Sequence, residues 1–233
     1  MRGSGTARAL SYLWGPEEGL SRLLVLLALF LFVVVPLGAS ASPGRPVVVA
    51  IDAILCLTAV SGALTVGSSR RRATLVASLA VGAFLLRFLE PDVGTLLHAA
   101  SAFLFALVFL ALAALLLGRV IRQGPVTRHR IEGAVATYLV LALVTASLHD
   151  AVVAVDPDAV RSPDGAPATG ADLLYLSLVT LTTIGYGDLV PVNPWSRALS
   201  AAAGLVGQLY PAILIARLVS LELTQRTEKG GRS

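Results

Sequence analysis

Several residue types that secreted proteins and metal sites depend on are scarce in this chain. Among 233 residues there is one cysteine, Cys56, so no disulfide can form within the chain. The three histidines are scattered without metal-ligand spacing, and only 14% of residues are charged. The net charge of +4 is distributed over short segments between apolar runs, which is not a nucleic-acid signature. Nothing in these features indicates an enzyme, a cofactor site or a nucleic-acid partner.

Apolar residues are abundant instead. They make up 56% of the chain, the mean hydropathy is +0.81, and they occur in runs near the ~20 residues that cross a bilayer. We therefore expect an all-α membrane protein with six transmembrane helices. The predicted spans are residues 20–35, 47–66, 73–89, 93–117, 131–155 and 194–223.

The basic residues predict the orientation of these spans. With the N-terminus inside, six spans return the C-terminus inside, and fourteen of the eighteen Lys and Arg residues then fall at cytoplasmic ends. Only Arg45, Arg87, Arg161 and Arg197 lie on the outer side. The positive-inside rule therefore favours cytoplasmic N- and C-termini.

One apolar segment, residues 171–181, is about half as long as a span needs to be. Such a helix is tolerated at membrane depth when it is buried in protein or lines water, so we predict a re-entrant helix. Thr169 is the expected N-cap, with Asp172 at the positive end of the helix dipole. Asn193 and Pro194 are the expected cap and first residue of the last helix.

The residues that follow this half-length helix, 182–188, have the sequence TTIGYGD. This resembles the signature of tetrameric potassium channels, and a physical reason supports the resemblance. Potassium leaving water needs oxygens to replace its hydration shell, and rings of backbone carbonyls supply them. Aiming successive carbonyls at one axis needs backbone conformations that glycine adopts at low cost. By resemblance, the ion sites are formed by the segment Thr183, Ile184, Gly185, Tyr186 and Gly187, with K⁺ held by the carbonyls of residues 183–186 and by the Thr183 hydroxyl.

The resemblance extends over residues 131–223 as outer helix, pore helix, selectivity-filter loop and inner helix. It implies a fourfold tetramer, because one chain carries one pore loop. Thr182 and Asp188 are expected to support the filter, and Val179 stands where some bacterial channels carry a buried glutamate. Gly207 has the spacing of the hinge glycine of related inner helices. Pro211 cannot donate to the carbonyl of Gly207, so we expect a gating bend there. On the same face, Gln208 and Ile215 are expected to line the cavity.

Three segments are predicted: a four-helix membrane domain at 1–122, a pore domain at 123–223 and a short cytoplasmic tail at 224–233. Four spans before a pore resemble voltage-gated channels, but no Arg or Lys lies between residues 93 and 118. A usual voltage sensor, which needs about three to four gating charges per subunit, is therefore excluded. The short linker before residue 131 favours packing of these spans on their own pore subunit. Asp52 and Arg87 are expected to form a structural pair, and His98 is either packed or pH-sensing.

Together these features predict a potassium-selective channel in a plasma membrane, the inner membrane of a bacterium, with K⁺, lipids and its own copies as partners. No cofactor other than the permeant K⁺ is expected. Alternatives are a nonselective monovalent cation channel, a potassium transporter and a non-conducting membrane scaffold. Tyr186 argues against the nonselective channel, and the single pore loop argues against the transporter.

Overall fold

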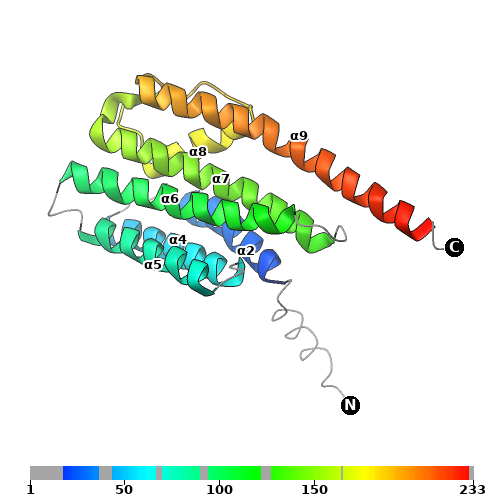
Figure 1. Ribbon diagram of the computed structural model, residues 1–233. Coiled ribbons are helices and arrows are strands. Elements are labelled where there is room, and N and C mark those ends of the chain that lie inside the picture. Colours follow the sequence, from blue (N-terminus) through cyan, green and yellow to red (C-terminus); the bar gives the residue numbers. More distant parts are fainter. Residues whose placement is uncertain are drawn as a thin grey trace, which may run out of the picture.

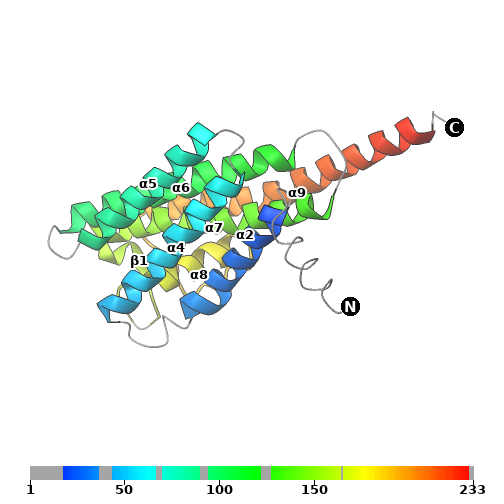
Figure 2. The ribbon, with the colours of Figure 1, turned by 90° about the horizontal axis from the view of Figure 1, so that it is seen from below.

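The computed structural model describes residues 18–36, 44–66, 70–89, 94–121, 127–163 and 165–230. These residues form a bundle of helices that run roughly alongside one another (Figures 1 and 2). Its N-terminal part consists of α2 (Glu18–Leu29), continued by the π-helical turn η1 (Phe30–Val34), then α4 (Arg45–Val66), α5 (Arg70–Leu89) and α6 (Thr95–Val120). Its C-terminal part consists of α7 (Arg128–Val155), the short α8 (Gly170–Leu181) and α9 (Pro194–Gly230).

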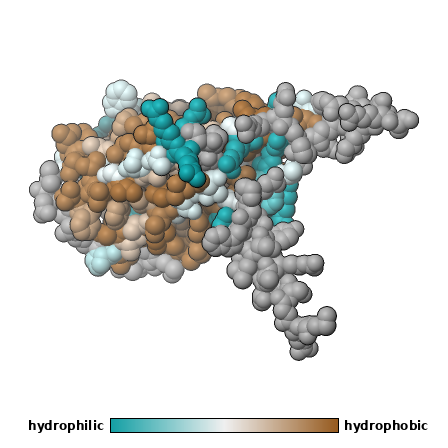
Figure 3. Space-filling view, turned by 60° about the horizontal axis from the view of Figure 1, so that its bottom comes forward, coloured by the Kyte–Doolittle hydropathy of each residue, from teal (hydrophilic) through white to brown (hydrophobic). Residues whose placement is uncertain are grey.

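Five of these helices, α4, α5, α6, α7 and α9, are long and apolar enough to cross a membrane. The first predicted span is also helical, but its apolar helix, Gly19–Val34, is shorter than the other five, which have 20 to 28 residues each. On the face shown in Figure 3, hydrophobic residues cover much of the described surface, as expected for helices that face lipid. The protein is therefore a multi-pass helical membrane protein, while the sixth span remains a prediction.

Helix α7 joins the two parts of the molecule. Both α6 and α2 pack along it on one side, and α8 and α9 pack against it on the other. The shared core draws on all these helices, and α2 and α6 contribute large, almost fully buried side chains to it, among them Leu23, Leu27, Phe109, Leu112 and Leu116. The first four helices thus pack on α7 of the same chain, the arrangement that the short linker favoured.

The segment between α7 and α8 contains short regular elements. A 3-10 turn, η3 (Pro157–Ala159), leads into β1 (Val160–Arg161), which pairs antiparallel with β2 (Val190–Pro191). The carbonyl of Ala159 accepts hydrogen bonds from the backbone N–H of Val192 and the hydroxyl of Ser196. These contacts attach the segment after the loop 182–188 to the end of α7.

The last helix is longer than predicted. We expected it to end near residue 223, but α9 continues to Gly230 as one helix of 37 residues. The added residues include Gln225, Arg226 and Glu228, which are good helix formers, and the first glycine pair comes only at Gly230. Residues 224–230 therefore continue the helix, and Figure 1 shows α9 extending beyond the bundle, while the division into a membrane domain, a pore domain and a cytoplasmic tail stays a prediction.

Candidate functional site

Helix α8 has the N-terminus that its sequence predicts. The Thr169 hydroxyl accepts a hydrogen bond from the Asp172 N–H at 3.3 Å, and the Asp172 carboxylate accepts one from the Thr169 N–H at 2.8 Å. This reciprocal pair is a capping box, so the predicted N-cap is confirmed. Asn193 likewise caps α9, because its side-chain oxygen accepts from the Trp195 N–H at 2.7 Å. The helices on both sides of the loop therefore begin where the sequence indicates.

At its other end, α8 turns directly into the loop. The Val179 carbonyl accepts hydrogen bonds from the backbone N–H groups of Ile184, at 2.9 Å, and Gly185, at 3.1 Å. The Thr182 hydroxyl donates back to the Leu178 carbonyl at 2.7 Å. A helix end leaves carbonyls without intrahelical partners, and here the loop itself supplies the donors. Val179 and Thr182 therefore hold the start of the loop through backbone and hydroxyl contacts.

The backbone of the loop alternates in a regular way. Thr183, Gly185 and Gly187 have positive φ angles of 59°, 54° and 78°. Glycine adopts this left-handed region at little cost, whereas a threonine there is strained. A left-handed residue at every second position is the alternation that the sequence argument required of a carbonyl-lined loop. The two glycines are therefore needed by the backbone itself.

All seven residues of the loop, 182–188, are exposed in the single chain. The side chains of Ile184 and Tyr186, expected to pack behind the filter, are 55% and 70% exposed. Helix α9 beside them is also poorly covered, with 11% of its apolar span buried. Nothing in the described part of this chain covers these two side chains, so the expected packing behind the filter is not present within one chain.

Asp188 is held by a residue that the sequence argument missed. The Tyr175 hydroxyl, on α8, donates to the Asp188 carboxylate at 2.8 Å, and the Leu189 N–H donates to its other oxygen at 3.1 Å. The hydrogen bond from Tyr175 favours the charged form and lowers the pKa of Asp188. Because Val179 is apolar and cannot hold Asp188, the side chain that does so lies one turn earlier on α8. The sequence feature that could have predicted this contact is a tyrosine, with its polar hydroxyl, among the aliphatic residues of α8.

Gly207, predicted as a hinge, lies at a close contact between α9 and α8. A Cβ atom added to it would lie 1.9 Å from the Leu181 carbonyl oxygen, so only glycine fits there. The same carbonyl accepts a hydrogen bond from the Tyr138 hydroxyl of α7 at 2.7 Å. Three helices therefore meet at the end of the pore helix. This contact is a packing reason for Gly207 that the hinge hypothesis did not include.

The remaining predicted site residues lie along α9. Pro211 is inside the helix, which is assigned as unbroken on both sides of it, so the gating bend remains a prediction. The Gln208 side-chain amide donates to the Thr183 hydroxyl at 3.3 Å, which places it beside the loop. Ile215, two turns further along, is 61% exposed, as a cavity-lining residue of one chain can be.

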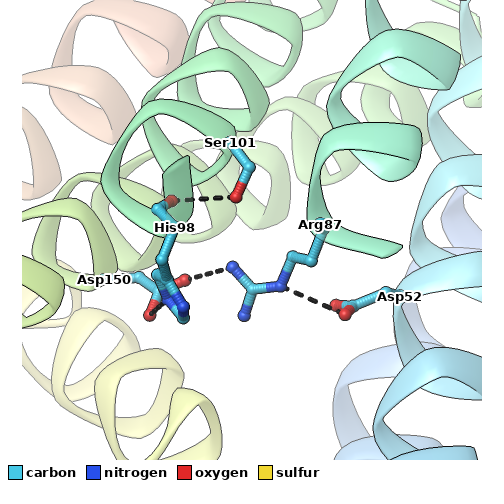
Figure 4. A network of polar contacts seen from close by, with 5 residues as sticks. All are labelled: Asp52, Arg87, His98, Ser101 and Asp150. Carbon is cyan, nitrogen blue, oxygen red and sulfur yellow. Dashed lines mark hydrogen bonds and ion pairs between the residues drawn. The ribbon is translucent and has the colours of Figure 1, made fainter. Parts of the chain in front are cut away.

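The predicted pair in the first four helices is confirmed and is larger than expected. Arg87 of α5 donates to Asp52 of α4 at 3.1 Å and to Asp150 of α7 at 2.7 Å (Figure 4). His98 of α6 lies 3.1 Å from the other Asp150 oxygen. The side chains of the two aspartates and Arg87 are 12–18% exposed. This cluster, Asp52–Arg87–Asp150–His98, joins four helices and reaches the outer pore helix.

A cavity of about 450 Å³ lies next to this cluster. Its wall includes Asp52, Arg87 and Asp150, and on the other side Thr169 and Gly170 at the start of α8. Residues of the first four helices and of α8 thus line one cavity.

Comparison with protein-family models supports an ion-channel assignment for the C-terminal part of the chain. Residues 134–222, which are 89 of the 233, match the model of a family described as Ion channel. This region runs from within α7 through α8 and the loop to within α9. No solved structure matches the chain significantly.

Curated relatives match a shorter region. Two pore potassium channel c of Oryza sativa subsp. japonica is 43% identical over 53 residues, which are 23% of this chain and 12% of the relative. Protein LctB of Bacillus caldotenax is 44% identical over 48 residues, 21% of this chain and 35% of that protein. Two-pore potassium channel 5 of Arabidopsis thaliana is 38% identical over 52 residues, 22% of this chain and 13% of the relative. The chain thus spans about a third or less of these relatives, and this multi-pass membrane protein is similar to potassium channels in its ion-channel region.

Proposed function

We propose that this protein is a potassium-selective channel in which four chains place their 182–188 loops around one axis. K⁺ is held by the backbone carbonyls of Thr183, Ile184, Gly185 and Tyr186 and by the Thr183 hydroxyl. Gly187 continues the alternating backbone toward the outer mouth. The carbonyl rings replace the hydration shell of the ion, so that conduction is passive and follows the electrochemical gradient.

The observation that carries this proposal is the alternation of left-handed residues in an exposed loop. Thr183, Gly185 and Gly187 share positive φ angles, and the whole loop is uncovered in one chain. A folded protein does not retain strain at Thr183 and exposed Ile184 and Tyr186 side chains without a use for them. Three further copies around an axis would cover the side chains and complete the oxygen rings. The match of residues 134–222 to an ion-channel family adds support.

The membrane location follows from the same proposal. Five helices are long enough to span, and the basic residues favour cytoplasmic termini in a plasma membrane, the inner membrane of a bacterium. The loop and the β1–β2 pair then lie on the outer side. Cys56 is buried, so a thiol introduced at residue 165 is expected to react with an impermeant reagent from outside only. Labelling of this thiol from the inside would mean that the protein has the opposite orientation.

The function is tested by purifying the protein, reconstituting it in liposomes and planar bilayers, and measuring reversal potentials with K⁺ on one side and Na⁺ on the other. A potassium-selective channel shifts the reversal potential strongly toward the K⁺ equilibrium potential. A reversal potential near zero would indicate the nonselective cation channel. Absence of ⁸⁶Rb⁺ flux would indicate a scaffold, and slow flux that requires a coupled ion would indicate a transporter.

A pair of glycine variants separates filter chemistry from backbone strain. Gly187 (φ 78°) and Gly165 (φ 74°) are both left-handed, and a Cβ added to either meets no atom within 4 Å in the chain. Alanine at either position therefore has a similar conformational cost, and only Gly187 is in the proposed ion path. We expect G187A to abolish K⁺ selectivity or conduction and G165A to preserve both. Equal effects of the two variants would contradict the proposal.

A further inference from the structure

Helix α9, the proposed inner helix, lies close to the start of the loop at Gly207. The absence of a side chain at Gly207 lets α9 contact the backbone of Leu181, where an added Cβ would lie 1.9 Å from the carbonyl oxygen. The next residue, Gln208, then reaches the loop, and its Nε2 donates to the Thr183 Oγ1 at 3.3 Å. This is a contact between residues 25 positions apart that depends on the close packing of the two helices.

Thr183 is the residue of the loop whose backbone and hydroxyl matter most to the proposed ion site. Apart from glycines, it has the only positive φ among the residues that the structure describes. Its neighbour Thr182 directs its hydroxyl back to the Leu178 carbonyl. Of the two threonine hydroxyls of the loop, that of Thr183 is therefore the one not bonded back to α8, and under the proposed function it belongs to the ion site nearest α9.

We infer that Gln208 is a specificity-determining residue that weakens ion binding at the innermost site by donating a hydrogen bond to the Thr183 hydroxyl. The inference rests on the proposed function. A hydroxyl oxygen has two lone pairs, and an N–H that occupies one of them brings a partial positive charge toward the place of the cation. An ion bound there must compete with the amide or displace it. With four chains, four amides act on the same site, which favours release of the ion over retention.

The contact also has a purely structural interpretation, in which it only fastens α9 to the loop. The two interpretations predict different results for a divalent ion. Ba²⁺ has nearly the radius of K⁺ and twice its charge, so its affinity for the site responds strongly to a nearby donor or carboxylate. A structural fastening would change protein stability and leave Ba²⁺ affinity unaffected.

The test is block of K⁺ current by Ba²⁺ applied from the side of the α9 C-terminus, in planar bilayers with the full chain. Q208L keeps the approximate size and removes the donor, and we expect its half-blocking Ba²⁺ concentration to fall about twofold to tenfold, as the net value of one hydrogen bond allows. Q208E keeps the shape and adds a carboxylate, so it should lower that concentration further. L209A alters the adjacent exposed residue and should leave Ba²⁺ block unchanged.

A double-mutant cycle assigns the effect to the Thr183 hydroxyl. In a T183V background, where the hydroxyl is absent, Q208L should no longer change Ba²⁺ block. If Q208L fails to assemble, Q208M, which also lacks the amide donor, carries the same comparison. Unchanged or weaker Ba²⁺ block in these variants, with K⁺ selectivity intact, would overturn the inference and leave the proposed function standing. A wild-type protein without K⁺-selective current would overturn both.

Discussion

The two parts of this chain are stabilised in different ways. The pore part, α7 to α9, is held around the loop by hydrogen bonds to specific carbonyls, such as those of Val179, Leu181 and Ala159. The first four helices are held by apolar packing on α7, by the Asp52–Arg87–Asp150–His98 cluster, and by polar contacts of Ser21 on α2 with α7. A loop that has to present its own carbonyls cannot use them for secondary structure, so its neighbours must supply the support. The N-terminal helices satisfy their backbone hydrogen bonds within each helix, so they need no such support.

The largest expected effect comes from G207A, which tests whether the pore part depends on a single backbone contact. The added Cβ would overlap the Leu181 carbonyl, which is backbone and cannot rotate away. Overpacking costs about 1–3 kcal/mol, and a clash with backbone lies at the upper end or beyond. We expect loss of the tetramer peak in size-exclusion chromatography and loss of K⁺ flux. G204A is the control, because a Cβ at Gly204 meets nothing within 4 Å. A stable, conducting G207A would contradict the packing role.

R87M is expected to have the next largest effect, and it tests whether the N-terminal part is coupled to α7 through charge. Removing one partner of a buried ion pair costs about 3–5 kcal/mol, and partial exposure of Arg87 and Asp150 places this case at or below the lower end. We expect a lower thermal midpoint in detergent. D150N should lower the thermal midpoint more than D52N does, because Asp150 also contacts His98.

The matched control for R87M is R71M, at the exposed opposite end of the same helix. It should leave the thermal midpoint within the error of the measurement. If R87M and R71M have the same thermal midpoint, the cluster does not hold α5 to α7. If D52N lowers the thermal midpoint more than D150N does, the contact with α7 is the weaker half of the cluster.

Y175F is expected to change the acid sensitivity of the filter. The Tyr175 hydroxyl lowers the pKa of Asp188, so the ionised carboxylate and the support it gives persist as the outer solution is acidified. A depressed pKa in the folded state means that this support is present above the ordinary aspartate pKa and is lost as pH falls through the lowered value. Without the hydroxyl, K⁺ current should fail at a higher pH.

The measurement is K⁺ conductance in bilayers against the pH of the outer solution. W195F, which changes another exposed aromatic residue of the outer side, should keep the wild-type profile. Coincident profiles for Y175F and the wild type would mean that the hydroxyl does not support Asp188.

P211A should have the smallest effect and tests the gating bend. Alanine restores an N–H that can donate to the Gly207 carbonyl, one hydrogen bond with a net value of about 0.5–1.5 kcal/mol. We expect open probability in single-channel records to change about twofold to tenfold, without loss of selectivity. A212G, which adds flexibility without changing the donor pattern, is the comparison. Unchanged gating in P211A would remove Pro211 from the gating machinery.

Local signals in the sequence predicted most of the fold well. The helix caps at Thr169 and Asn193 were found because capping depends on residues within three positions of each other. Helix boundaries shifted by about a turn in α5, α6 and α7, where polar residues at the ends continue the helix. The β1–β2 pair was missed because its strands have two residues each and carry no periodic pattern.

Contacts between distant residues were predicted only in part. The pair Asp52–Arg87 was found because both are charges inside apolar spans at similar depth, but the contact of Arg87 with Asp150 of α7 was not predicted. Tyr175 was missed because a tyrosine in an apolar helix is usually an anchor or a core residue. Gly207 was interpreted through helix flexibility, since the approach of Leu181 cannot be inferred from spacing.

The amino-acid sequence alone determined which segments are apolar helices, where the short re-entrant helix begins, and which residues can adopt a left-handed backbone in the loop. These properties depend on hydrophobicity, capping and φ preferences of neighbouring residues. Only the tertiary structure decided that Tyr175 holds Asp188, that Gly207 fits against Leu181, and that Arg87 joins Asp52 to Asp150. Such contacts depend on how whole helices are placed relative to one another, which is a collective result of packing and not a property of any one segment.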